Sequence, residues 1–197
     1  MKLLLATRNA KKLAELERIL AGSVSVELVG LNDVTAYPEA PETGLTFEEN
    51  ALLKAREAVR YTGLPSVADD SGLAVDALNG MPGVFSARWS GKHGDDLANL
   101  QLVLAQTGDV PPSHLGASFV CVAAVVWPDG RERTVRGEMR GHLVREPKGE
   151  GGFGYDPIFV ADGQTRTNAE LTNAEKDAIS HRGNAFRALA ELLAQEG

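Results

Sequence analysis

The stretch that decides the fold of this 197-residue chain is FVCVAAVVWPDGRERTVRGEMRGHLV, residues 119–144. The apolar run 119–127 is typical of a buried strand, and Pro128, Asp129 and Gly130 form a strong turn signal. The run 132–144 therefore predicts the partner strand of a hairpin. Because the apolar run is too short to cross a bilayer as a helix, we expect no membrane partner.

Further elements are expected on both sides of this hairpin. Apolar runs and helical spacing predict strands at 2–6, 24–29, 64–68 and 73–78, and helices at 10–20, 46–60, 95–106 and 182–195. Two capping-box patterns, Thr46 with Glu49 and Thr172 with Glu175, mark helix starts. Strand–helix units together with a long hairpin predict an α/β protein with a mixed twisted sheet.

Composition and charge limit the class of protein. Hydrophobic residues make up 43% of the chain, which is ordinary for a globular protein, and the net charge is -7. An acidic chain offers no broad basic surface, so we expect no nucleic-acid partner; a small triphosphate needs only a local basic pocket. Cys121 is the only cysteine, which excludes an intrachain disulfide. Because it lies within the apolar run, we interpret it as a buried strand residue. The apolar run 3–6 is too short for a signal peptide, so we expect a cytoplasmic protein.

The first expected strand leads into Thr7-Arg8-Asn9-Ala10-Lys11-Lys12. Where a strand runs into a helix N-terminus, unpaired N–H groups and the helix dipole favour an anion. Thr7 and Asn9 add short polar side chains, and Lys12 adds a positive charge. We interpret this segment as a phosphate site, although Asn9 as a simple helix N-cap explains it equally well. The glycines of a Walker or dinucleotide-binding loop are missing.

A second motif is Asp69-Asp70-Ser71-Gly72, which follows an apolar run. Adjacent residues of a strand point to opposite faces, so at most one of the two carboxylates easily enters a site on a given side. An ionised Asp there can hold Mg²⁺ or take a proton from water. A turn before Gly72 is the alternative. Glu42 is a loop carboxylate that could share the metal, or simply a solvated loop acid.

A third pair of motifs is Gly151-Gly152-Phe153-Gly154-Tyr155-Asp156-Pro157 and Ser180-His181-Arg182-Gly183. The glycines let the backbone approach a flat ligand, and Phe153 offers that ligand an aromatic face. Asp156 supplies acceptors, while His181 and Arg182 supply donors. One stacking ring with several polar groups predicts a nucleobase site. Capping of the last helix is a second role for His181 and Arg182, and both roles can hold together.

Taken together, these motifs resemble the inosine triphosphate pyrophosphatase family, the Ham1-like non-canonical purine nucleoside triphosphate pyrophosphatases, in its bacterial branch. The resemblance covers essentially the whole chain, with six motifs in the family's order at 7–12, 42–51, 69–73, 82–88, 151–157 and 179–183. Arg8 is a departure, because many members carry Gly there. Its longer side chain either touches a phosphate or points outward.

The resemblance implies a fold and an assembly. We expect a single domain, residues 1–197, with an elongated two-lobed α/β fold, a mixed twisted sheet and a nucleotide cleft between the lobes. The family also implies a homodimer. Phe85, Trp89 and Trp127 are candidates for its interface, with core packing as the alternative.

The resemblance also implies the site residues. Asp70 is expected to be the proton acceptor and, with Glu42, a ligand of Mg²⁺, the expected cofactor. Lys12 and Lys54 are expected to stabilise phosphate charge, although Lys54 is explained equally well as a surface lysine. The expected substrate-binding residues are Thr7, Arg8, Asn9, Ala10, Lys11, Lys12, Ser71, Phe153, Gly154, Tyr155, Asp156, Lys176, His181 and Arg182.

The implied activity is hydrolysis of dITP, ITP and XTP or dXTP to the nucleoside monophosphate and pyrophosphate, which keeps modified bases out of DNA and RNA. Lys176, His181 and Arg182 offer only donors; these match the 6-oxo group of hypoxanthine and xanthine and leave adenine's 6-amino group unpaired. Guanine shares the 6-oxo group, and no pattern explains its rejection. The alternatives are a Maf-like pyrophosphatase for pyrimidine or methylated nucleotides and a non-catalytic nucleotide sensor. Retention of Asp70 and Glu42 with the lysines argues against the sensor.

Overall fold

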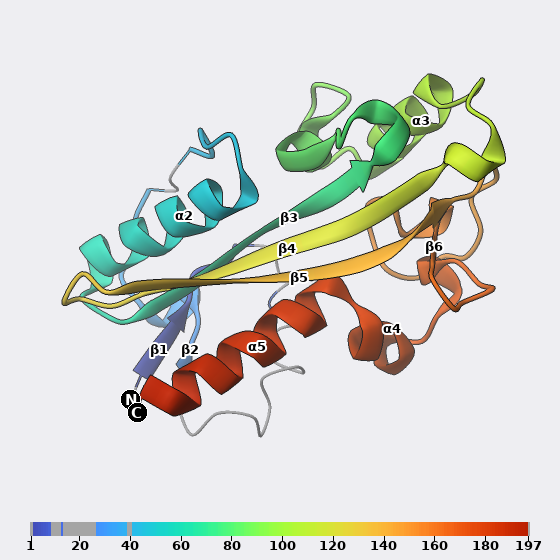
Figure 1. Ribbon diagram of the computed structural model, residues 1–197. Coiled ribbons are helices and arrows are strands. Elements are labelled where there is room, and N and C mark those ends of the chain that lie inside the picture. The colour runs from blue at the N-terminus through green and yellow to red at the C-terminus, as the bar shows by residue number, and fades with distance from the viewer. Residues whose placement is uncertain (1, 9–12, 14–26, 39–40, 197) are drawn as a thin grey trace. The chain divides into compact units, whose positions relative to one another are not determined.

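The computed structural model describes residues 2–8, 13, 27–38 and 41–196 (Figure 1). The expected phosphate-site residues Asn9, Ala10, Lys11 and Lys12, and most of the helix expected at 10–20, lie outside these ranges. The described strands are β1 (Lys2–Leu5), β2 (Glu27–Val29), β3 (Ser66–Val75), β4 (Gly116–Val126), β5 (Glu132–Leu143) and β6 (Phe159–Ala161). The α-helices whose full extent lies within these ranges are α2 (Phe47–Thr62), α3 (Asp96–Gln106), α4 (Asn173–Ile179) and α5 (His181–Glu196).

The strands form one mixed sheet in the order β2-β1-β3-β4-β5-β6. β1 runs parallel to β2 and β3, and β6 runs antiparallel to β5. The predicted hairpin is confirmed, because β4 and β5 are neighbours joined by a turn in which the Gly130 N–H donates to the Trp127 carbonyl at 3.0 Å. The predicted α/β class with a mixed sheet is therefore confirmed as well.

The chain divides into two compact units, which we describe separately. Unit 1 comprises residues 1–70, 121–137 and 182–197, and unit 2 comprises residues 71–120 and 138–181. β3, β4 and β5 therefore each contribute residues to both units. The expectation of one two-lobed domain over residues 1–197 stays a prediction.

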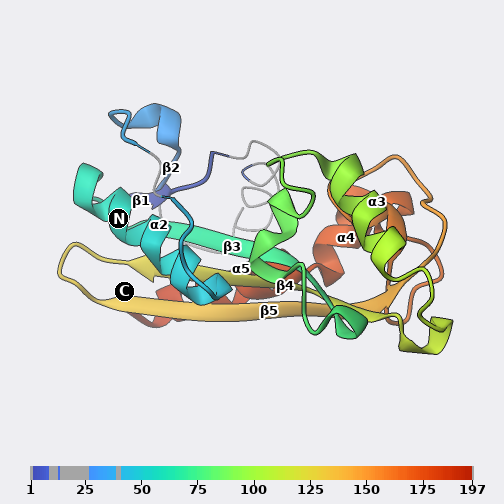
Figure 2. The same cartoon turned by 90° about the horizontal axis from the view of Figure 1, so that it is seen from above.

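In unit 1, successive side chains of β4 point to opposite faces of the sheet, and a different helix covers each face. The odd-numbered residues from 121 to 127 pack with α5, for example with Phe186. The even-numbered residues from 122 to 126 pack with α2, for example with Ala51. Figures 1 and 2 show α2 and α5 on opposite sides of β4. Because both faces are covered, the apolar run is buried throughout, as its composition predicts.

Unit 2 has a core of its own, built from residues of β3, β4, β5, β6 and α3. The fully buried Phe159 meets the Phe119 ring edge-on, with the centroids 4.8 Å apart. Asp95 caps α3 by accepting a hydrogen bond from the Ala98 N–H at 3.2 Å. The helix therefore begins where the sequence predicts.

The Asp doublet lies inside a strand. β3 runs unbroken through residues 66–75 and carries Asp69 and Asp70 in its middle. The expectation of two short strands at 64–68 and 73–78, and the alternative of a turn before Gly72, are therefore both wrong. Asp has a low strand propensity, but tertiary contacts override such preferences, and each carboxylate has partners on a helix.

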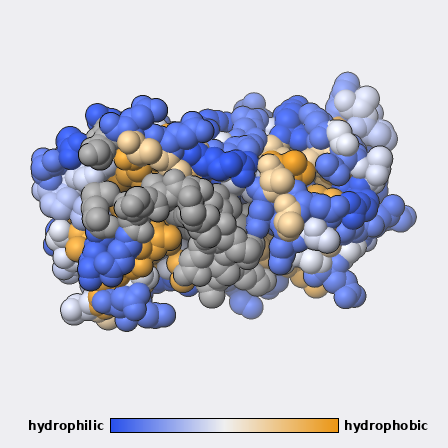
Figure 3. Space-filling view, turned by 90° about the horizontal axis from the view of Figure 1, so that it is seen from below, coloured by the Kyte–Doolittle hydropathy of each residue, from blue (hydrophilic) through white to orange (hydrophobic). Residues whose placement is uncertain are grey.

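Hydrophilic residues predominate on the face seen in Figure 3, and hydrophobic ones gather in a few separate patches. Of the three interface candidates, Trp127 is 6% exposed and Trp89 packs against the core of unit 2, whereas Phe85 is 40% exposed. Core packing thus accounts for the two tryptophans. Within the ranges that the structure describes, no helix has the length and apolar character needed to cross a bilayer.

Candidate functional site

β3 directs Asp69 and Asp70 to opposite faces of the sheet, as their adjacency predicts. On the face covered by α5, Asp69 Oδ2 lies 3.6 Å from Arg182 Nε. On the face covered by α2, Asp70 Oδ2 accepts a hydrogen bond from Asn50 Nδ2 at 3.0 Å. Both aspartates are buried. The two acids therefore lie on different faces of the sheet, and Asp70 lies on the face that α2 covers.

Lys54 follows Asn50 by one turn of α2 and approaches two carboxylates. Its Nζ lies 2.8 Å from Glu42 Oε1 and 3.5 Å from Asp70 Oδ1. The Lys54 side chain is 15% exposed, so the interpretation as a surface lysine is wrong. One ammonium thus gathers two acids, one from a loop and one from a strand, and these three residues form a polar group in unit 1.

The neighbouring acids sustain the charge of Lys54. Burial alone would lower the pKa of the ammonium, but the carboxylates of Asp70, Asp69 and Glu42 raise that pKa above its ordinary value. Lys54 is therefore protonated at neutral pH. Because the ammonium is largely removed from water, it acts more strongly on a bound anion than an exposed lysine would.

The loop before α2 is tied to the first turns of the helix. Three successive N–H groups donate to helix side chains: Gly44 to Asn50 Oδ1 at 2.8 Å, Leu45 to Glu49 Oε2 at 2.6 Å and Thr46 to Glu49 Oε2 at 3.2 Å. Thr46 Oγ1 accepts in return from the Glu49 N–H at 3.1 Å, which confirms the predicted capping box. The loop that carries the first acid of the group is therefore held by its own helix.

Sequence reasoning placed Asn50 in the motif at 42–51 but gave it no role in the site. The residue is fully buried, and its side chain joins the Gly44 N–H to the Asp70 carboxylate. The available signal was its place within a helix, where asparagine is unfavourable unless its side chain has a specific partner.

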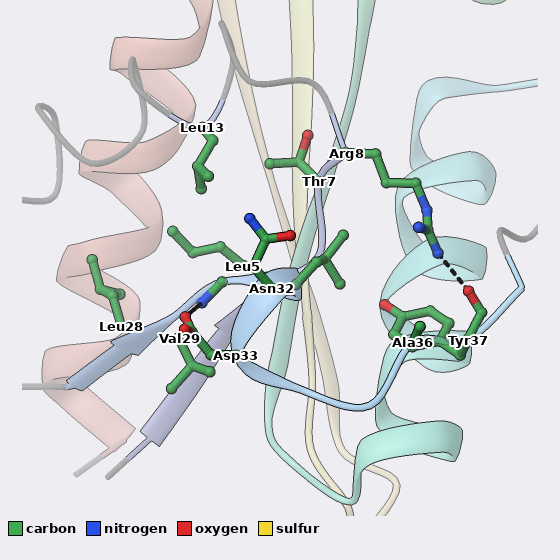
Figure 4. A pocket seen from close by; sticks show the side chains of 12 residues that line it. Leu5, Thr7, Arg8, Leu13, Leu28, Val29, Asn32, Asp33, Ala36 and Tyr37 are labelled. Carbon is green, nitrogen blue, oxygen red and sulfur yellow. Dashed lines mark hydrogen bonds between the residues drawn. The ribbon is translucent and has the colours of Figure 1, made fainter.

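Thr7 and Arg8 lie one residue beyond the end of β1 and line a pocket of about 580 Å³ in unit 1 (Figure 4). The Ala6 N–H donates to the Val67 carbonyl at 2.8 Å. The chain therefore leaves the sheet beside the strand that carries Asp70. The remainder of the expected phosphate segment lies outside the described residues.

Arg8 is engaged with the segment that precedes α2. Its Nη2 donates to the Tyr37 carbonyl at 2.5 Å, and its guanidinium carbon lies 5.5 Å from the centroid of the Tyr37 ring. Tyr37 in turn stacks on Tyr61 of α2, with the ring centroids 5.2 Å apart. The Arg8 side chain therefore does more than point outward, since it joins the segment after β1 to the connection between β2 and α2.

In unit 2, Asp156 is at the centre of the residues expected to recognise a base. Its Oδ2 accepts from Lys176 Nζ at 2.6 Å and from the Phe153 N–H at 2.9 Å, and its Oδ1 accepts from Asn168 Nδ2 at 3.2 Å. Asp156 and Lys176 are both buried. The carboxylate thus fixes the Lys176 ammonium, which lies 5.1 Å from the centroid of the Phe153 ring.

Gly152 is required by the packing of this loop. Its φ of 71° favours glycine, and a Cβ atom there would collide with the Asp156 carboxylate. Gly152 therefore lets the loop wrap around an acid of its own chain. That reason is independent of the flat ligand that the glycines were expected to admit.

Two further expected substrate residues are held inside unit 2. The Tyr155 hydroxyl donates to the Ser86 carbonyl at 2.8 Å, and burial raises the pKa of Tyr155, so the phenol stays protonated. The His181 ring stacks on Phe119 with the centroids 5.0 Å apart, and His181 is 4% exposed. Packing therefore fixes both rings.

The expected site residues fall into two groups, one in each unit. Unit 1 contains Thr7, Arg8, Glu42, Lys54, Asp70 and Arg182, and unit 2 contains Ser71, Phe153, Gly154, Tyr155, Asp156, Lys176 and His181. The first group combines acids with cations, as phosphate chemistry requires. The second combines an aromatic ring with buried polar groups.

Glu42 and Asp70 fit a divalent cation. Their oxygens already gather around the ammonium of Lys54, so a positive charge is favourable at this place. Mg²⁺ is usually held by one or two carboxylates, with water and substrate phosphates completing its shell. Two acids therefore suffice for a substrate-bridged ion. Among residues with described positions, no group of three or more His, Cys, Asp or Glu lies close enough together to hold a metal ion.

Comparison with known proteins finds relatives that match nearly the whole chain. A family model described as "Ham1 family" matches residues 3–192. A dITP/XTP pyrophosphatase from Nocardia farcinica is 65% identical, with 98% of this chain and 95% of the relative aligned. A crystal structure titled as a nucleoside-triphosphatase / dITP/XTP pyrophosphatase from Mycobacterium abscessus superposes with a TM-score of 0.81 at 62% identity, covering 98% of this chain and 99% of that one. A HAM1 protein from Coxiella burnetii superposes with a TM-score of 0.90 at 42% identity, covering 99% of each chain.

Proposed function

Because the chain belongs to the Ham1 family, we propose that it hydrolyses dITP, ITP and XTP or dXTP to the nucleoside monophosphate and pyrophosphate. The observation that carries this proposal is the group formed by Glu42, Lys54 and Asp70 in unit 1. Relatives between 57% and 65% identical over nearly the whole chain bear the name dITP/XTP pyrophosphatase, which supports the same activity here. The cellular role that follows is removal of modified purines before they enter DNA or RNA.

Asp70 is the proton acceptor of the reaction. Water must attack the triphosphate at the linkage of its α- and β-phosphates, and a carboxylate that takes the proton makes that water a better nucleophile. Asn50 fixes one oxygen of Asp70, which limits the directions in which the carboxylate can turn. The Lys54 ammonium stabilises the charge that develops on the phosphate oxygens.

Glu42 and Asp70 would hold Mg²⁺, the proposed cofactor. When bound, Mg²⁺ supplies neutralisation of phosphate charge and a fixed orientation of the triphosphate. Glu42 is suited to this role because the loop that carries it is anchored to α2 through the N–H groups of residues 44–46. Thr7, Arg8 and Ser71, with the segment 9–12, provide further phosphate contacts in this proposal.

Residues of the unit 2 group, together with Arg182, recognise the purine. Phe153 stacks on the base, and the neighbouring residues Gly154 to Asp156 shape its surroundings. Lys176, His181 and Arg182 donate to the 6-oxo group and its neighbours, where adenine would present a 6-amino donor instead. Asp156 supports this role because it holds the buried ammonium of Lys176 in one position.

The proposal extends to the setting in which the enzyme works. We place it in the cytoplasm as a homodimer that binds neither nucleic acid nor membrane; the family resemblance implies the homodimer. The net charge of -7 supports the absence of a nucleic-acid partner, because a polyanion would be repelled.

A nucleotide panel tests the proposed function. We expect kcat/KM for dITP, ITP and XTP to exceed that for ATP by at least about a hundredfold, because a buried donor set leaves the amino group of adenine unpaired. The assay follows nucleotide loss by chromatography in the presence of Mg²⁺. Equal rates for ATP and ITP would contradict the proposal. A preference for methylated or pyrimidine nucleotides would favour a Maf-like enzyme, and binding without turnover would favour a sensor.

A further inference from the structure

We propose that Asn50 is a positioning residue that locks the Asp70 carboxylate and the Glu42 loop into one arrangement competent to hold a divalent cation. The inference rests on the proposed function, and it concerns a residue that touches neither substrate nor metal itself. Its basis is that the two acids come from separate parts of the chain, a loop and a strand. Asn50 connects these two parts with a single side chain.

The two ends of the Asn50 side chain have different partners. Nδ2 donates to Asp70 Oδ2 at 3.0 Å, and Oδ1 accepts from the Gly44 N–H at 2.8 Å. Asn50 is fully buried, so water cannot readily replace either bond. The second oxygen of Asp70, Oδ1, lies 3.5 Å from Lys54 Nζ. Asp70 is thus held through one oxygen by a neutral donor while the other faces the cation of the site.

Packing around Gly44 makes the connection tight. A Cβ atom at Gly44 would lie 2.7 Å from Asn50 Oδ1, 2.7 Å from Glu49 Cβ and 3.0 Å from the Asn50 backbone nitrogen. No L side chain fits there without moving the helix backbone or the loop. The loop therefore approaches Asn50 as closely as its backbone allows, two residues after Glu42.

Asn99 provides a matched control for a purely structural asparagine. Like Asn50, it is buried near the start of a helix, at 1% exposure, and bonds through both ends of its amide. Its Oδ1 accepts from the Ser90 N–H at 2.7 Å, and its Nδ2 donates to the Ala87 carbonyl at 3.2 Å. Both partners of Asn99 are backbone groups, whereas one partner of Asn50 is the carboxylate of Asp70.

The test compares Asn50→Leu, Asn50→Ala and Asn99→Leu with the wild-type protein. Leu keeps a branched outline and removes both hydrogen bonds, and Ala keeps the test open if Leu does not fit. Mn²⁺ binding to the nucleotide-free protein is measured by electron paramagnetic resonance, alongside kcat, KM and the thermal midpoint. We expect both Asn50 variants to bind Mn²⁺ about 10–100-fold more weakly and to lose kcat by a similar factor, the usual effect of residues that orient metal ligands.

The control separates positioning from folding. Asn99→Leu should lower the thermal midpoint about as much as Asn50→Leu does, yet keep wild-type Mn²⁺ affinity and kcat. Folded Asn50 variants that bind Mn²⁺ as the wild type does would overturn the inference, as would an equal loss of affinity in the control. Absence of nucleotide hydrolysis by the wild type would contradict the proposed function alone, because the Mn²⁺ comparison needs no substrate. Absence of Mn²⁺ binding by the wild type would overturn the inference.

Discussion

Replacement of Asp70 by Asn is expected to lower kcat for dITP by at least about a hundredfold, the range found when a general base is lost. The amide has nearly the same shape as the carboxylate but cannot take a proton from water. The substitution also puts a neutral amide where Lys54 and Asn50 now contact a carboxylate. Substrate affinity should survive in part, because Phe153 and the remaining cations are unchanged.

The matched control for this substitution is Asp76→Asn. Asp76 directly follows β3, is exposed and forms an ion pair with Arg140, which lowers the pKa of Asp76. We expect kcat of this variant to stay within about twofold of wild type, because exposed pairs contribute little and lie outside the proposed machinery. Steady-state assays with circular dichroism on both variants make the comparison. A well-folded Asp70→Asn enzyme with near-normal kcat would remove Asp70 from the mechanism.

The second large effect is expected for Lys54→Met, which should lower kcat/KM by about 10²–10³-fold, the usual result of losing one preorganised charge at a reacting group. Methionine fills much of the lysine's volume, so the loss is mainly electrostatic. Without the ammonium, the negative charges of Glu42 and Asp70 are no longer compensated by the cation that now contacts both carboxylates. The variant without metal should therefore unfold at a lower temperature than the wild type.

Added Mg²⁺ gives this prediction a second readout. A cation that replaces the lost ammonium should raise the thermal midpoint of Lys54→Met more than that of the wild type, because ligand binding stabilises the folded state. Lys92→Met is the control: the Lys92 side chain is 80% exposed, and its Nζ lies 3.7 Å from Asp95 Oδ2. Its kcat/KM and its response to Mg²⁺ should match those of the wild type. Equal behaviour of the Lys54 and Lys92 variants would refute the assignment.

Local signals in the sequence predicted several elements closely. The capping box at Thr46 and Glu49 places the start of α2, because its hydrogen bonds involve residues only three apart. The turn at 128–130 likewise predicts the hairpin of β4 and β5. Such features depend on neighbours along the chain, so they can be predicted without knowledge of the packing.

Features that depend on distant partners could not be predicted in the same way. β3 continues through Asp69 and Asp70 because Arg182 and Asn50 lie on opposite faces of the sheet, and that arrangement exists only after folding. β6 was missed altogether, because a strand of three residues carries too little periodicity to detect. The place of Asn50 was missed for the same reason, since its two partners become neighbours only when the loop and the strand meet.

The central claim concerns which bond of the triphosphate breaks, and ³¹P nuclear magnetic resonance of a single reaction tests it most directly. The wild-type protein is incubated with ITP and Mg²⁺, with no other phosphatase present, and the first products are identified. Our account predicts that inosine monophosphate and pyrophosphate appear together in equal amounts from the earliest time point. Inosine diphosphate and orthophosphate as the first products would contradict it.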